Sequence, residues 1–168
     1  MNNVRYIDRT CTLAIVAAVC CFTFSGCLYE VPITAKPTRK IDERLLGDWT
    51  SKDGQHKMKV VKLDDSNYIV CKRDKDGGVF SSGDLFRVYH SDVAKTAFVS
   101  VQILDKPKPS YAYWNWKLSE DGTLHLRCVN DKVVPDETKD SASVRKLLEG
   151  NLQNPNLFGE DNQFTKDK

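Results

Sequence analysis

This sequence lacks most of the features that mark an enzyme or a nucleic-acid-binding protein. It contains no Gly-x-Ser-x-Gly, phosphate-binding loop, His-Glu-x-x-His or Cys-x-x-Cys motif, and only three histidines. Its formal net charge of +2 gives no electrostatic argument for a nucleic-acid partner. We therefore expect a non-enzymatic protein that has no catalytic residues, no metal site and no cofactor.

Charge is also missing from one long stretch near the start of the chain. No charged residue lies between Arg9 and Glu30, although 29% of all residues are charged. The stretch follows two arginines, is apolar up to Phe24 and then continues with small residues, which is the order of regions in a secretory signal peptide. Its length also overlaps that of a membrane-spanning helix, so hydropathy alone leaves both alternatives open.

The end of this stretch favours the signal peptide. Phe24-Ser25-Gly26-Cys27 resembles the lipobox of bacterial lipoproteins, with Phe24 at a position where leucine is usual. The resemblance implies cleavage between Gly26 and Cys27, palmitate-type acylation, and anchoring in a membrane through lipid on the Cys27 sulfur. The next residue is Leu28 and not aspartate, which in Gram-negative lipoproteins is typical of the outer membrane.

The rest of the chain divides by composition and hydrophobic period. Residues 27–40 contain two prolines and no periodic pattern, and they are predicted to form a tether between lipid and domain. The predicted segments are a signal peptide over 1–26, this tether, an antiparallel β domain over 41–136, a helix and docking segment over 137–158, and a flexible tail over 159–168.

Apolar and polar residues alternate through the predicted β domain, in short runs that polar turns separate. This period of two is typical of antiparallel strands with one buried face. A meander of about seven strands removes its exposed edges by curling into a small lipocalin-like barrel or a tight sandwich. A helix with a cap at Asp140 or Ser141 is predicted to follow and to cover part of the sheet. The predicted strands are 46–50, 56–63, 68–73, 84–90, 97–104, 111–118 and 123–129.

Two cysteines remain after the predicted cleavage and lipidation. Cys71 and Cys128 form an even pair in an exported protein, so they are either a disulfide or two buried thiols. A shared metal is not favoured, because His125 and Cys128 are three residues apart and point to opposite faces of a strand. His56 and His90 each stand alone in their strands and are predicted to be surface or structural residues.

Gly47-Asp48-Trp49 opens the first predicted strand. A Gly-x-Trp motif there resembles the lipocalin and lipocalin-like families, in which the tryptophan closes one end of a ligand-binding barrel and an arginine stacks on it. By this resemblance Arg127 is the candidate to stack on Trp49. The order of motifs also resembles small uncharacterised bacterial lipoproteins, which carry no known activity to transfer.

Trp114 and Trp116 share one face of a strand and are the candidate ligand-binding residues, although core packing explains the same pattern. Two functions remain open. The first is an envelope lipoprotein with a structural or interaction role and an unknown envelope protein partner. The alternative is a lipocalin-like carrier of a small apolar ligand. The size of the interior distinguishes them, because a carrier needs a cavity on the order of 300 Å³ or more.

Overall fold

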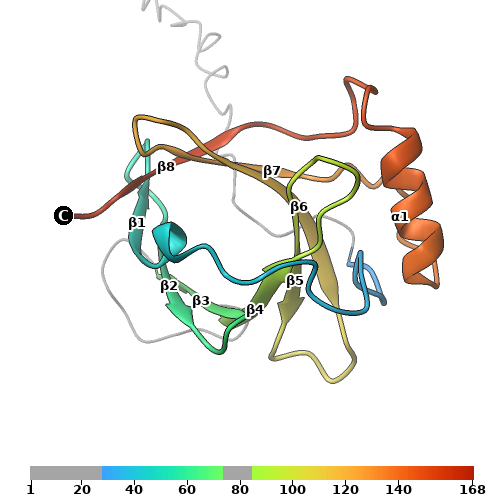
Figure 1. The fold of residues 1–168 in the computed structure, drawn as a ribbon, viewed down its shortest axis with the longest axis horizontal. Helices are drawn as coiled ribbons and strands as arrows, with labels where there is room; N and C mark the ends of the chain where they lie inside the picture. Colours follow the sequence, from blue (N-terminus) through green and yellow to red (C-terminus); the bar gives the residue numbers. More distant parts are fainter. Residues whose placement is uncertain (1–27, 74–84) are drawn as a thin grey trace, which may run out of the picture.

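The computed structural model describes residues 28–73 and 85–168, and within them the chain forms a closed antiparallel barrel (Figure 1). Each strand pairs with its neighbour in the sequence, and β8 pairs with β1 to close the ring. The elements are η1 (Glu43–Leu45), β1 (Gly47–Ser51), β2 (Lys57–Lys62), β3 (Tyr68–Arg73), β4 (Leu85–His90), β5 (Phe98–Ile103), β6 (Tyr111–Leu118), β7 (Leu124–Cys128), α1 (Ser141–Gly150) and β8 (Asn162–Lys166).

The predicted fold class is confirmed. All seven predicted strands are present, and their observed ends agree with the predicted ends to within one residue. The alternation of apolar side chains places one face of each strand inside the ring, where a buried cluster extends from Trp49 to Phe164. Of the two architectures predicted, the protein has the barrel and not the sandwich, because the last strand bonds to the first.

The prediction of a flexible tail over 159–168 is wrong. Asn162–Lys166 is β8, which pairs with β1 and β7 and contributes the buried Phe164 to the interior. Only one large apolar side chain lies in this strand, so its sequence shows no alternating pattern. It is held by neighbours that are distant in the sequence, since Thr50 pairs with Thr165.

The prediction of a tether over 27–40 is also wrong for residues 28–40, while Cys27 lies outside the described residues. Tyr29 and Ile33 are buried, and the backbone N–H of Ile33 donates to Ser100 Oγ on β5 at 3.1 Å. Further along, the N–H of Thr38 donates to the carbonyl of His90 at 2.9 Å. This segment, residues 28–40, therefore packs along the outside of the barrel wall.

A second core lies outside the barrel, against β5 and β6. It joins Tyr113 of the wall to Val144 and Leu148 of α1 and to Tyr29 and Ile33, and Figure 1 shows α1 beside this wall. Both outer and inner faces of β6 are thus covered, as its aromatic residues on both faces predicted. The helix prediction is confirmed, because the Asp140 side chain accepts from the N–H of Ser143 and caps the helix.

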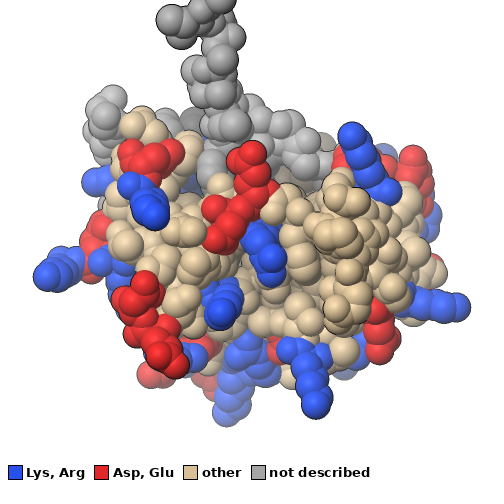
Figure 2. Space-filling view, turned by 90° about the horizontal axis from the view of Figure 1, so that it is seen from above, with Lys and Arg blue, Asp and Glu red and all other residues tan. Residues whose placement is uncertain are grey.

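Charge is spread evenly over the visible surface. Figure 2 shows lysine and arginine side chains interspersed with acidic ones on the face seen from above. Among the described residues no helix is long and apolar enough to cross a membrane.

Candidate functional site

The inside of the barrel contains a cavity of about 140 Å³. Strands β2 to β8 all contribute side chains to its wall, and η1 adds Leu45. The wall is almost entirely apolar and includes both candidate ligand-binding tryptophans. The apolar wall consists of Leu45, Met58, Val60, Tyr68, Val70, Phe86, Val88, Val99, Val101, Trp114, Trp116, Leu124, Leu126 and Phe164.

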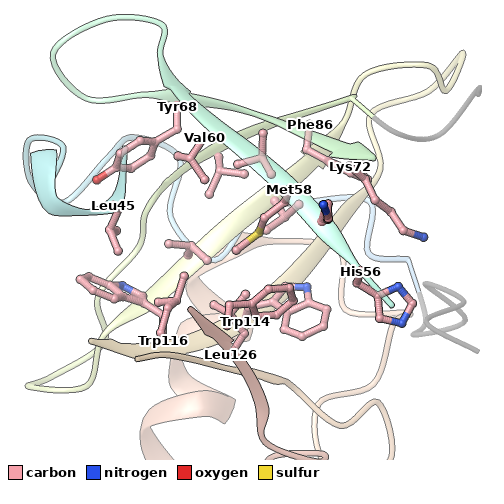
Figure 3. A pocket seen from close by; sticks show the side chains of 17 residues that line it. Leu45, His56, Met58, Val60, Tyr68, Lys72, Phe86, Trp114, Trp116 and Leu126 are labelled. Carbon is pink, nitrogen blue, oxygen red and sulfur yellow. The ribbon is translucent and has the colours of Figure 1, made fainter. Parts of the chain in front are cut away.

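The two ends of the cavity differ (Figure 3). At one end, here called the closed end, Leu45 and Tyr68 lie close to Trp116. At the opposite end, here called the mouth, His56 and Lys72 point away from the apolar wall. Polar and charged lining side chains therefore gather at the mouth, where the cavity meets the barrel rim.

The closed end is sealed by the chain that leads into β1. Trp49 is 1% exposed, and its indole N–H donates to the carbonyl of Leu45 at 2.9 Å. Gly47 has φ of +125°, a backbone conformation that residues with a Cβ rarely adopt. These contacts show why Gly-x-Trp stands here: the glycine permits the turn from η1 into β1, and the tryptophan fills the end of the barrel.

Arg127 does not stack on Trp49, so this expectation is wrong. The Arg127 guanidinium lies 4.5 Å from the centre of the Phe158 ring and donates to Asn115 on β6. The cation near Trp49 is instead Lys166, whose Nζ lies 5.7 Å from the ring centre. Because Lys166 belongs to β8, a strand that was not predicted, no local pattern indicated this contact.

A buried histidine, predicted from the sequence to be a surface or structural residue, continues the inward row of Phe86 and Val88 at the closed end. His90 is fully buried, and its Nε2 lies 2.9 Å from the Tyr68 hydroxyl. Burial, followed by the nearby Arg39 guanidinium, lowers the pKa of His90 to about 4, so its imidazole is neutral at neutral pH. Within the described residues, His90 Nδ1 and Trp116 Nε1 are buried without a hydrogen-bond partner.

Cys71 and Cys128 are not joined by a disulfide. Val70 and Lys72 line the cavity, so Cys71 between them faces the outside of the wall. Cys128 continues the inward row of Leu126 and faces inward, so the wall itself separates the two sulfur atoms. Of the two alternatives that the sequence left open, a disulfide or two thiols, the structure contains the two thiols.

The reactive side chains that the sequence offered lie in separate places in the described part of the chain. Burial raises the pKa of the Cys128 thiol to about 11, which keeps it protonated and weakly nucleophilic at neutral pH. His125 Nδ1 lies 2.7 Å from an Asp161 carboxylate oxygen on the outer surface. Within residues 28–73 and 85–168, no three His, Cys, Asp or Glu side chains are placed to hold a metal ion.

Comparison of the chain with protein-family models, with curated proteins and with solved structures finds no match in any of the three.

Proposed function

We propose that this protein is a membrane-anchored binding module whose barrel holds one small, uncharged, largely apolar molecule. The observation that carries the proposal is the cavity of about 140 Å³ with its apolar wall. A purely structural barrel is expected to fill its interior with side chains, because native cores are close-packed.

Keeping the cavity has a cost in stability. At roughly 24 cal/mol per Å³ of unfilled volume, about 140 Å³ corresponds to about 3 kcal/mol. This is a substantial part of the 5–15 kcal/mol that is typical of a folded domain. A ligand that fills the space would recover part of that free energy on binding.

The volume restricts the class of ligand. It is about half of the ~300 Å³ lower bound for drug-sized ligands, and close to the ~150 Å³ of apolar cavities that bind benzene. The cavity is therefore smaller than the carrier alternative required. We propose instead a ligand no larger than a substituted benzene or a short acyl chain.

A matched pair of substitutions tests the cavity. Val101→Phe adds a ring to a cavity-lining residue that is 8% exposed, whereas Val61→Phe adds the same ring to a residue on β2 that is 36% exposed. Calorimetric titration of the full chain with toluene and with 1-hexanol should show saturable binding for the unchanged protein and for Val61→Phe. Val101→Phe should lose binding at least tenfold, a difference of about 1.4 kcal/mol.

Two results would count against the cavity. Equal binding by the two variants would show that the ligand lies elsewhere. Absence of binding by the unchanged protein to both probes would overturn the proposed function itself. The thermal midpoint of each variant, measured without ligand, verifies that loss of binding is not loss of fold.

We further propose that Cys27 carries the lipid anchor, on the strength of its sequence context alone. Two or three acyl chains would anchor the protein durably, since each buried methylene contributes about 0.8 kcal/mol. Cys27→Ser should leave the precursor uncut and abolish labelling by radioactive palmitate. Labelling that persists in Cys27→Ser would disprove the anchor without affecting the cavity.

A further inference from the structure

The position at which the chain joins the barrel is fixed by the residues directly after Cys27. Tyr29 is 2% exposed and exchanges two backbone hydrogen bonds with Tyr111, at 2.9 and 2.8 Å. Its ring stacks on Tyr113 with the centroids 3.9 Å apart, and its hydroxyl donates to the carbonyl of Val134 at 2.7 Å. Leu28 packs against the cluster inside the barrel.

This junction lies at the mouth and not at the closed end. Tyr111 is the first residue of β6 and follows the β5–β6 hairpin, which lies at the same end of the barrel as His56 and Lys72. From Tyr29 the chain runs along the wall towards the closed end, where Thr38 bonds to His90. Position 27 is two residues from Tyr29, and two extended residues span at most about 7 Å.

The rim of the mouth beside this junction combines apolar and basic side chains. Leu85 and Leu104 are 40% and 41% exposed, and the N–H of Leu104 donates to the carbonyl of Leu85 at 3.2 Å. The hairpin that follows adds the exposed Lys106 and Lys108, with one acidic residue, Asp105. Exposed leucines next to lysines match the boundary between acyl chains and anionic headgroups.

We propose that the barrel sits on a phospholipid bilayer with its mouth towards the headgroups, so that the cavity is entered from the membrane side. Leu85, Leu104, Lys106 and Lys108 form the contact. The proposal rests on the Cys27 anchor proposed above, and it identifies the ligand as the terminal part of a lipid hydrocarbon chain, because a cavity of about 140 Å³ cannot hold a whole chain. That chain belongs either to a bilayer lipid or to the anchor itself.

Two exposed leucines provide a matched test of this orientation. Leu104 lies at the mouth, whereas Leu63 is 52% exposed in the β2–β3 turn, next to the chain that seals the closed end. Photoreactive benzoylphenylalanine is placed at one position or the other in the full chain, in native membranes. Illumination should give several-fold more lipid adducts at position 104 than at position 63. Lys106→Glu combined with Lys108→Glu should lower the yield at position 104.

The outcomes separate the orientation from the anchor. Equal yields at the two positions, or a higher yield at position 63, would overturn the orientation even when palmitate labelling shows that Cys27 is acylated. Loss of palmitate labelling with a preserved excess at position 104 would disprove the anchor and leave the orientation standing. Mass spectrometry of the adduct distinguishes the two sources of the hydrocarbon chain. A bilayer lipid increases the mass of the labelled peptide by the mass of that lipid. The anchor instead gives a crosslink to the peptide that contains Cys27.

Discussion

The buried histidine at the closed end should make the folded state sensitive to mild acid. His90 is fully buried, and the groups around it are the Tyr68 hydroxyl, the Trp116 ring, the Arg39 guanidinium and the carboxylates of Asp92 and Asp42. Burial and Arg39 favour the neutral imidazole, and the two carboxylates oppose them only in part. Protonation would therefore place a charge in the barrel wall that nothing nearby fully compensates.

The sign and size of the effect follow from the two pKa values. In the unfolded chain His90 has the ordinary pKa of 6.5, and in the folded protein its pKa is about 4. Between these values the unfolded state binds more protons, so the free energy of unfolding falls as the pH is lowered from 6.5 to about 4. At about 1.4 kcal/mol for each pH unit, the total loss is about 3 kcal/mol.

Urea denaturation followed by tryptophan fluorescence at intervals from pH 7.5 to pH 4.5 measures this loss. The lower limit stays above the range in which the aspartates, with ordinary pKa values of 3.8, begin to dominate. His90→Gln should be less stable at pH 7.5 but should have a flatter pH profile. A wild-type profile that stays flat from pH 6.5 to pH 4.5 would refute the reasoning.

Three further substitutions, one with a matched control on the same strand, test the barrel and its helix. Phe164→Ala removes a cavity-wall ring from β8 and should lower the free energy of unfolding by about 3–5 kcal/mol, measured by urea denaturation. Thr165→Ala on the exposed face of the same strand should change it by less than about 0.5 kcal/mol. Gly47→Ala should cost about 1–3 kcal/mol, seen as a lower thermal midpoint, because φ at this residue is +125°. Asp140→Ala removes the helix cap and should lower the free energy of unfolding by about 1 kcal/mol. Amide hydrogen exchange in the first turn of α1 should become faster. Unchanged exchange would show that the cap is not needed.

The candidate site was only partly visible in the sequence. Trp114 and Trp116 could be assigned to one face of a strand because side chains alternate every two residues. Their contact with a cavity, and its volume of about 140 Å³, depend on how side chains from β2 to β8 pack against each other. No local pattern encodes that volume, since it is the space left after packing. For the same reason the burial of His90 could not be read from its neighbours in the chain.

The sequence by itself determined the seven alternating strands, the turns between them and the capped helix, because each depends on residues within a few positions of one another. Only the tertiary structure decided the fate of the two ends of the domain. Residues 28–40 and Asn162–Lys166 have no periodic pattern, and they are ordered by contacts with distant residues such as Ser100 and Thr50. The pairing of Thr50 with Thr165 also closes the barrel, so the cavity exists only in the assembled fold.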